Sequence, residues 1–418
     1  MSGLAEVTSP PYDVIAADNE SRLMAMDPHN VVRLILPRHQ AGEPGSPYDD
    51  AAADLTRWLD DGVLVPDPKP ALYVYEQVTV GPDGTRPDRP GAIQRGLIGA
   101  LGLVPYAAGI VQPHEDVAPG PVAGRRQLME ATRANLEPIF LLYEGGNAVA
   151  NRLVDEVADG RQPIAEACTP DGQRHRLWAI TDPGEIAAIG ADLAPRTAMI
   201  ADGHHRYVAY LQVQQRLRQA GAGPGPWDLG LAMLVDSSAY PPRVGAIHRV
   251  VTGLVPEAAA KLAGSAFAVR ELPGGTADLP AALADLADAG RRGVAFLLTG
   301  NERAYLLTDP DPGQLRIAVP DQPAELWQHV PSAVLEGLLF ARIWGIEDDA
   351  RTVRALHDAA EAVRAADEEP GGTGVICCPM SAAQVYQVAA LGRRVPRKST
   401  SFGPKPRSGL VLRMFAQG

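Results

Sequence analysis

The chain has 418 residues, of which 46% are hydrophobic and 21% are charged, a composition typical of globular proteins. Single cores stop growing at roughly 250 to 300 residues, so we expect two or three subdomains. The formal net charge is −12. Because the phosphate backbone repels an acidic chain, this charge excludes a general nucleic-acid binder.

The cysteines and the N-terminal residues bear on the cellular compartment. Cys168, Cys377 and Cys378 are too few for a disulfide framework, and the adjacent pair lacks the two-residue spacing of metal-binding motifs. Residues 1–19 have neither the basic start nor the apolar stretch of a signal peptide. No run approaches the roughly 18 apolar residues of a membrane helix. We therefore expect a cytoplasmic protein that does not bind membranes.

The first part of the chain predicts a small α/β region. The two prolines in residues 9–15 favour an ordered loop entering a strand. Residues 30–37 form a short apolar run between breakers, which suggests a buried strand. Residues 49–59 predict a helix and 71–80 a strand. The following loop at 81–90 is rich in Pro, Gly and Asp and marks the first expected boundary.

The middle of the chain alternates strands and helices, as α/β layers do. An Asp171-Gly172 turn separates two extended pieces, and a capping acid at Asp182 starts a helix. The predicted strands are 94–104, 139–143, 174–180, 196–201, 229–235 and 244–251, and the predicted helices are 124–135 and 207–219.

Beyond a second boundary near Gly253, segments rich in Ala and Leu alternate with strands. The spacing predicts a strand at 294–298 and a helix over 352–365. The expected organisation is mixed α/β (α+β), with an N-terminal region at 1–90, a phosphate-binding core at 91–252 and a C-terminal region at 253–418 that carries a basic tail segment.

The segment Asp202-Gly203-His204-His205-Arg206 joins a predicted strand to a predicted helix. The unpaired N–H groups and the dipole at a helix N-terminus favour an anion, and phosphate is the natural ligand. Gly203 permits a sharp turn, His204, His205 and Arg206 can donate to phosphate oxygens, and Asp202 is placed to hold Mg2+. The plainer alternative is that Asp202 caps the helix and the histidines bind nearby carbonyls.

Two further segments carry candidate residues. Gln112-Pro113-His114-Glu115-Asp116 precedes the helix that bears Arg125 and Arg126, and its glutamate is a candidate general base or merely a helix-entry acid.

The second segment, residues 396–406, gathers Lys398, Ser399, Thr400 and Lys405 with prolines in an otherwise acidic chain. It suits either a clamp over a polyphosphate or a solvated basic stretch. His248-Arg249 follows an apolar strand and is a candidate for the same site or a buried pair bound to backbone.

Several motifs together resemble one family. Pro11-Tyr12-Asp13-Val14-Ile15, Pro113-His114-Glu115, the 201–207 segment around the Asp-Gly-His-His-Arg pentad, His248-Arg249, and Lys398-Ser399-Thr400 with Pro404-Lys405-Pro406 resemble the bacterial and archaeal family called domain of unknown function 1015. The central part also resembles the free serine kinases of the ParB/sulfiredoxin superfamily. This chain has many more residues between the two central motifs than those small kinases have.

The resemblance implies roles for particular residues. Glu115 with His114 and Asp202 would be catalytic, Asp202 would bind Mg2+, and ATP or ADP would be the nucleotide. The implied nucleotide contacts are Gly203, His204, His205, Arg206, Lys398, Ser399, Thr400 and Lys405, and the implied substrate contacts are Tyr12, Asp13, Arg126, His248 and Arg249.

These observations favour a nucleotide-dependent kinase for a small hydroxylated metabolite, such as free L-serine. A ParB-like nucleotide-binding switch or scaffold without metabolite turnover is the alternative. A third hypothesis treats His114, Glu115, His204 and His205 as a transition-metal hydrolase site, although the sequence lacks paired histidines on one helix face. The net charge disfavours a ParB-like nuclease.

Overall fold

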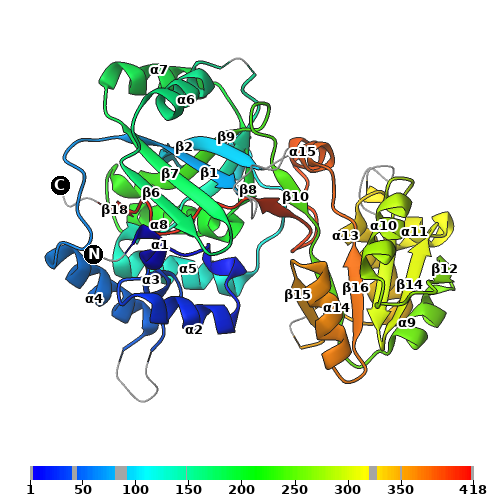
Figure 1. The fold of residues 1–418 in the computed structure, drawn as a ribbon. Coiled ribbons are helices and arrows are strands. Elements are labelled where there is room, and N and C mark those ends of the chain that lie inside the picture. The colour runs from blue at the N-terminus through cyan, green and yellow to red at the C-terminus, as the bar shows by residue number, and fades with distance from the viewer. Residues whose placement is uncertain are drawn as a thin grey trace. The chain divides into compact units, whose positions relative to one another are not determined.

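The computed structural model describes residues 3–39, 45–80, 92–146, 148–319, 327–348 and 351–415, with the side chains of 17 and 18 left aside. Contacts divide the chain into two compact units (Figure 1). Unit 1 contains Met1–Pro113, Val117–Arg243 and Phe402–Gly418, and unit 2 contains His114–Asp116 and Val244–Ser401. The predicted boundary loop 81–90 lies outside the described residues, and the division at 90 and 252 stays a prediction.

In the described part of unit 1, eight strands form a mixed sheet in the order β3-β8-β5-β9-β2-β1-β7-β6. The pairs β3–β8 and β5–β9 are parallel, and the other neighbours are antiparallel. The strands are β1 Leu72–Thr79, β2 Ile93–Gly102, β3 Val111–Gln112, β5 Ile139–Tyr143, β6 Ala165–Thr169, β7 Gln173–Ile180, β8 Ala198–Asp202 and β9 Leu229–Asp236. The strands predicted in this region are confirmed, with bounds shifted by a few residues.

Two core clusters share one face of this sheet. Leu97 pairs with Leu234, which pairs with Leu141, so the three side chains lie on the same face. Helices α6 (Val149–Gly160) and α7 (Pro183–Leu193) pack with Leu97, and helix α8 (His204–Gln219) packs with Leu141. Helix α5 (Pro119–Thr132) lies against α8. The helices predicted at 124–135 and 207–219 and the cap at Asp182 are confirmed.

The N-terminal region adds a layer of helices to unit 1: α1 Leu4–Val7, α2 Ala17–Met26, α3 Val32–Ile35 and α4 Pro47–Asp60. The strand predicted at 30–37 is wrong, because the Asn30 side chain accepts a hydrogen bond from the Val32 N–H at 3.0 Å and starts the short helix α3. Burial of a short apolar run does not distinguish helix from strand. The segment 9–15 leads through a 3-10 turn, Tyr12–Val14, into α2 and not into a strand.

Both ends of the described chain belong to unit 1. Ser9 and Ser408 form an antiparallel bridge, and the Arg407 guanidinium donates to the Thr8 carbonyl at 2.9 Å. Strand β18 (Arg413–Met414) pairs with β4 (Ala134–Asn135). The C-terminal segment is therefore an integral part of this unit, where the sequence predicted a basic tail.

In the described part of unit 2, six strands form an antiparallel sheet in the order β12-β14-β13-β16-β11-β15. They are β11 His248–Val251, β12 Ala268–Glu271, β13 Phe296–Gly300, β14 Arg303–Thr308, β15 Val353–Leu356 and β16 Thr373–Cys377. The helices are α9 Pro256–Ala263, α10 Leu279–Gly290, α11 Pro312–Ala318, α13 Pro331–Val334, the π-helix η4 Leu335–Trp344, α14 Ala359–Glu368 and α15 Ala382–Ala390. Short strands β10 (Arg243–Gly245) and β17 (Ser401–Gly403) contain two of the positions where the chain passes between units.

The helix predicted over 352–365 is wrong in its first half. Residues 353–356 form strand β15 at the edge of the unit 2 sheet, and the helix begins only after Asp358, whose side chain accepts from the Glu361 N–H. Pairing with β11 overrides the helical spacing of Val353 and Leu356. The described residues thus form a mixed α/β protein whose two larger sheets are one mixed sheet and one antiparallel sheet.

Candidate functional site

The pentad lies at the turn between β8 and α8 of unit 1, as the sequence predicts. Asp202 is the last residue of the strand, and His204 is the first residue of the helix. Gly203 has φ of +96°, a left-handed conformation that disfavours other residues, and an added Cβ would lie 2.7 Å from Ile139 Cγ2. The first N–H groups of α8 have no partner within the helix, so this turn has the geometry of an anion site.

The Asp202 carboxylate binds two cations. Arg206 Nη2 lies 2.6 Å from Oδ2, and Lys405 Nζ lies 2.5 Å from Oδ1. Burial alone would raise the pKa of Asp202, but the charges of Lys405 and Arg206 outweigh it and hold the pKa well below its ordinary value. The carboxylate is therefore ionised, and both of its oxygens are engaged by side chains.

Arg206 is buried and stabilises this turn. Its Nη1 donates to the Pro138 carbonyl at 2.6 Å, and its Nε is buried without a hydrogen-bond partner among the described residues. Burial would lower the pKa of Arg206, whereas Glu137 and Asp202 raise it above its ordinary value. Two of its three nitrogens are already used inside the protein, so Arg206 is less available to phosphate than the sequence suggests.

The Tyr12-Asp13 segment belongs to the same cluster. Lys405 Nζ donates to Asp13 as well as to Asp202. The Tyr12 N–H donates to Glu137 Oε1 at 3.2 Å, and the Arg125 guanidinium lies 4.2 Å from the centre of the Tyr12 ring. Burial raises the pKa of Tyr12 to about 12. The N-terminal loop, the pentad and Lys405 are thus joined by direct contacts within unit 1.

The two histidines of the pentad differ in their surroundings. His204 is buried at the start of α8. His205 Nε2 accepts the Ala118 N–H at 3.0 Å, which assigns the proton to Nδ1. One ring nitrogen of His205 is thus engaged by the backbone of residue 118. Arg126 pairs with Glu130 one turn along α5, at 2.6 Å.

The remaining predicted site residues lie in unit 2. His114 is buried and its Nε2 lies 2.8 Å from Thr400 Oγ1, while Glu115 Oε2 accepts the Ser399 N–H at 3.4 Å. Glu115 also forms a parallel bridge with Val395. The predicted His-Glu motif and the Lys-Ser-Thr motif are therefore neighbours, although they are far apart in the sequence.

Arg249 organises the same part of unit 2. Its side chain is 1% exposed and contacts Asp348 at 3.0 Å, Glu336 at 3.9 Å and the Arg397 carbonyl at 3.4 Å. Lys398, next in the chain, has φ of +57°.

The environment shifts the pKa values of His248 and Glu336 in this part of unit 2. His248 Nδ1 accepts the Cys377 N–H at 3.1 Å, and burial lowers the pKa of His248 to about 4. Burial and Asp348 raise the pKa of Glu336 to about 7, against the opposing effect of Arg249.

The chain can be placed among known proteins by a family match. The model of the family DUF1015, described as a protein of unknown function, matches residues 1–333. The chain belongs to this family. No curated protein matches it.

Several solved structures show a distant likeness to this DUF1015 protein. A variant of a free serine kinase in complex with ADP has a TM-score of 0.37 and 14% identity, covering 76% of this chain and 92% of its own. SbnI with a C-terminal truncation, from Staphylococcus aureus, has a TM-score of 0.36 and 9% identity, covering 73% and 82%. A conserved hypothetical protein from Pyrococcus furiosus has a TM-score of 0.36 and 12% identity, covering 74% and 90%.

The described residues form no ready-made metal site. Both oxygens of Asp202, the predicted Mg2+ ligand, contact cationic side chains. Among the described residues, no group of three or more His, Cys, Asp and Glu side chains could hold a metal. Asp202 is an ion-pair partner in this structure, its role as a Mg2+ ligand stays a prediction, and the transition-metal hydrolase hypothesis gains no support. No helix in the described part is long and apolar enough to cross a membrane.

Sequence reasoning missed four residues of these clusters. Glu137 and Arg125 complete the unit 1 cluster, where Arg125 Nη1 lies 3.8 Å from Glu137 Oε2. Glu336 and Asp348 face Arg249 in unit 2. The three acidic residues belong to no recognisable sequence motif. Arg125 could have been found, because it precedes Arg126 in the helix that follows the His-Glu segment.

Proposed function

We propose that this protein is a nucleotide-dependent phosphotransferase that acts on the hydroxyl group of a small metabolite, with free L-serine as the first candidate. One observation carries the proposal: the β8–α8 turn presents a helix N-terminus, opened by Gly203, inside a cluster that holds Lys405 and Arg206. Such a turn favours the phosphate groups of ATP or ADP. We also propose that residues 91–252 have a ParB/sulfiredoxin-like fold.

The unit 1 cluster determines which groups would contact phosphate. The ion pairs with Asp202 hold the side chains of Arg206 and Lys405, so their positive charges stay close to the turn. The turn at Gly203 and the His204 and His205 residues are the groups proposed to contact phosphate. Tyr12 and Asp13 are proposed to contact the acceptor molecule, because the Asp13 carboxylate can pair with an ammonium group of that molecule.

The proposed chemistry needs one base. The acceptor hydroxyl oxygen attacks the terminal phosphorus, the bond from that phosphorus to the bridging oxygen breaks, and Glu115 takes the hydroxyl proton. The Ser399 N–H would orient the Glu115 carboxylate, and the His114–Thr400 contact would support the segment that carries this N–H. Lys398 is proposed as a further phosphate contact, and His248 and Arg249 as supports of the acceptor side.

A second candidate is a nucleotide-binding switch without metabolite turnover. The observation that favours it is the double pairing of Asp202, since phosphoryl-transfer enzymes commonly hold Mg2+ with such a carboxylate. A protein that only binds nucleotide has no need of a carboxylate that is free for metal. The two candidates differ in one measurable respect, the formation of a phosphorylated product.

The deciding experiment uses the full chain with ATP or ADP, supplied as their Mg2+ complexes, and a set of hydroxylated metabolites that includes L-serine. Phosphorus NMR should show a new phosphate monoester that requires both nucleotide and acceptor. Nucleotide binding by calorimetry without any product would select the switch. Absence of nucleotide binding would contradict both candidates.

A further inference from the structure

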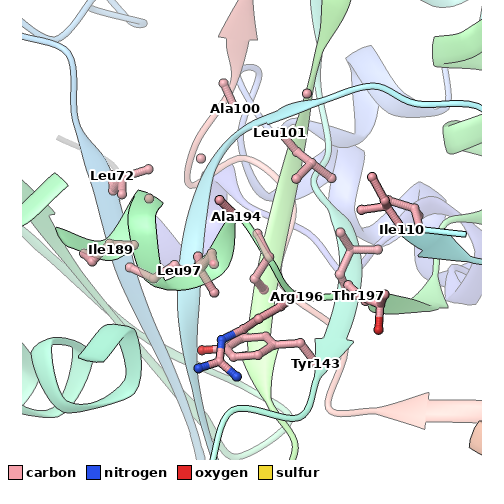
Figure 2. Close-up of a pocket in the computed structure, with 18 residues that line it drawn as sticks. Leu72, Leu97, Ala100, Leu101, Ile110, Tyr143, Ile189, Ala194, Arg196 and Thr197 are labelled. Carbon is pink, nitrogen blue, oxygen red and sulfur yellow. The ribbon is translucent and has the colours of Figure 1, made fainter. Parts of the chain in front are cut away.

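A pocket of about 290 Å³ lies in unit 1 (Figure 2). Most of its lining is aliphatic, including Leu72, Leu97, Leu101, Leu141, Ile189 and Leu234. These residues come from both core clusters on this sheet face, and Ile189 belongs to α7. Its volume is near the lower end of the roughly 300 to 1,000 Å³ range of small-molecule sites.

Three small residues are part of the pocket lining. They are Ala198 on β8, Gly102 on β2 and Gly190 on α7. Gly102 and Gly190 are exposed, and a Cβ added at either would meet nothing within 4 Å, so the pocket is open to solvent beside them. Water in a pocket with mostly aliphatic walls finds few hydrogen-bond partners, whereas an apolar molecule gains contacts there.

One end of the pocket is polar. Tyr143 is 3% exposed, and its hydroxyl makes no hydrogen bond to any residue that the structure describes. Figure 2 shows its ring beside Arg196, whose guanidinium carbon lies 5.8 Å from the ring centre. Burial and the nearby Asp236 raise the pKa of Tyr143 above its ordinary value, so the phenol stays neutral and can donate a hydrogen bond.

The charges around this end disfavour an anion. Arg196 binds Asp192 through Nη2 at 2.8 Å, the Asp192 carbonyl through Nε at 2.9 Å and the Glu144 carbonyl through Nη1 at 3.0 Å. Its charge is thus balanced by Asp192, and Asp236 adds a further negative charge near Tyr143. A neutral oxygen acceptor, such as a carbonyl, is the group that the Tyr143 hydroxyl can bind without an electrostatic cost.

We propose that this pocket binds a small neutral molecule with an apolar body and one carbonyl oxygen, held by the Tyr143 hydroxyl. The site is separate from the pentad and independent of the proposed phosphotransferase activity. Ala198 and Asp202 stand at the two ends of β8, and four residue steps of a strand span about 13 Å.

Three probes of similar size test the chemistry of the pocket. Acetophenone carries a neutral carbonyl, benzoate carries a charge, and ethylbenzene has no acceptor. Calorimetry and ligand-observed NMR with the full chain should show that acetophenone binds most tightly. Loss of one hydrogen bond in Tyr143→Phe should weaken acetophenone binding by about 2- to 12-fold and leave ethylbenzene unchanged.

A substitution that fills the pocket tests the location. Ala198 is two residues from Ile200, which pairs with Leu141, so Ala198 projects on the pocket face. Ala198→Leu should abolish acetophenone binding, whereas Ala179→Leu, on β7 and outside the pocket lining, should leave it intact.

Equal binding of benzoate and acetophenone, or acetophenone binding that survives both Ala198→Leu and Tyr143→Phe, would overturn the proposal. If Ala198→Leu fails to fold, as judged by circular dichroism, the Tyr143→Phe comparison decides alone.

Discussion

Lys405 Nζ lies 2.5 Å from Asp202 Oδ1 and also donates to Asp13, so one buried ammonium group joins the C-terminal segment, the pentad and the N-terminal loop of unit 1. The Lys405 side chain is 12% exposed and that of Asp202 is 10% exposed. Burial would lower the pKa of Lys405, but the two carboxylates outweigh this effect and raise it above its ordinary value. The charges are thus interdependent, and removal of one leaves the others uncompensated.

We expect Lys405→Met to lower the free energy of unfolding by about 3 to 5 kcal/mol, the usual cost of breaking a buried ion pair from one side. Urea unfolding of Lys405→Met, Asp202→Asn and the double variant measures this cost and the coupling. The double variant should be less destabilised than the sum of the single variants, because the second change removes the charge that the first one exposed.

An exposed ion pair provides the control for this cycle. Arg270 and Asp285 lie 2.8 Å apart with 58% and 46% of their side chains exposed. Arg270→Met should change the unfolding free energy by no more than about 1 kcal/mol. Additive effects of Lys405→Met and Asp202→Asn would show that the contact is not energetically coupled.

The conformation of Gly203 leads to a second prediction. An alanine in the left-handed region costs about 1 to 2 kcal/mol, and at Gly203 the new methyl group would also lie 2.7 Å from Ile139 Cγ2. Gly221 has φ of +86° with open space around the added Cβ. Chemical denaturation should therefore show a larger loss for Gly203→Ala than for Gly221→Ala, by about 1 to 3 kcal/mol of overpacking. Equal losses of stability would mean that the Ile139 side chain moves away from the new methyl group at no cost in free energy.

Local signals account for what the sequence could predict about the pentad. An Asp-Gly pair after an apolar strand and before a helical pattern indicates a tight turn, and the structure has this turn at Gly203. The predicted strand and helix on either side follow from hydrophobic spacing alone.

The rest of the site depends on contacts between distant parts of the chain. Glu137 meets the Tyr12 N–H, and His114 meets Thr400, only because the fold brings these segments together. The same limit explains the error at 353–356, where pairing with β11 decides the structure of residues whose spacing suits a helix. The pairing of Asp202 with Lys405 likewise joins residues that are far apart in the sequence, and no local pattern could indicate it.

Two buried histidines predict a loss of stability in mild acid. Burial lowers the pKa values of His175 and His248 to about 4. The unfolded chain takes up protons near the ordinary value of 6.5 while the folded chain does not, so stability is complete above pH 6.5 and falls as the pH drops towards 4.

At pH 5 each of these histidines should account for a loss of about 2 kcal/mol relative to neutral pH. Urea unfolding at pH 7 and pH 5 should show that His175→Gln and His248→Gln each reduce this loss by their share. His329→Gln, at an exposed position, should leave it unchanged, and an unaltered pH dependence in both buried variants would contradict the prediction.

Glu336 should give the stability of the protein the opposite pH dependence. Its pKa is raised to about 7 by burial and by Asp348. A folded-state pKa above the unfolded value gives stability that is complete below pH 4.5 and is lost as the pH rises through 7. Glu336→Gln should therefore gain stability relative to the unchanged chain between pH 5 and pH 8 in thermal unfolding. Glu369→Gln, an exposed acid, should show no such trend; a parallel trend in both variants would exclude Glu336 as its origin.

The last prediction concerns Glu115, the base in the proposed phosphotransferase. A glutamine at this position keeps an oxygen that can accept the Ser399 N–H, so Glu115→Gln should preserve the local structure. The amide cannot take a proton, and loss of a general base lowers kcat by about 10²- to 10⁴-fold. Nucleotide affinity should stay nearly unchanged, because the proposed phosphate donors belong to the β8–α8 turn.

Asp116→Asn serves as the matched control, since Asp116 pairs with Arg394 at 3.3 Å and has no proposed part in catalysis. Steady-state rates of phosphate ester formation, together with calorimetric nucleotide binding, separate the two effects. Turnover that survives Glu115→Gln undiminished would remove Glu115 from the mechanism and leave the β8–α8 turn as the part of the proposal still to be explained.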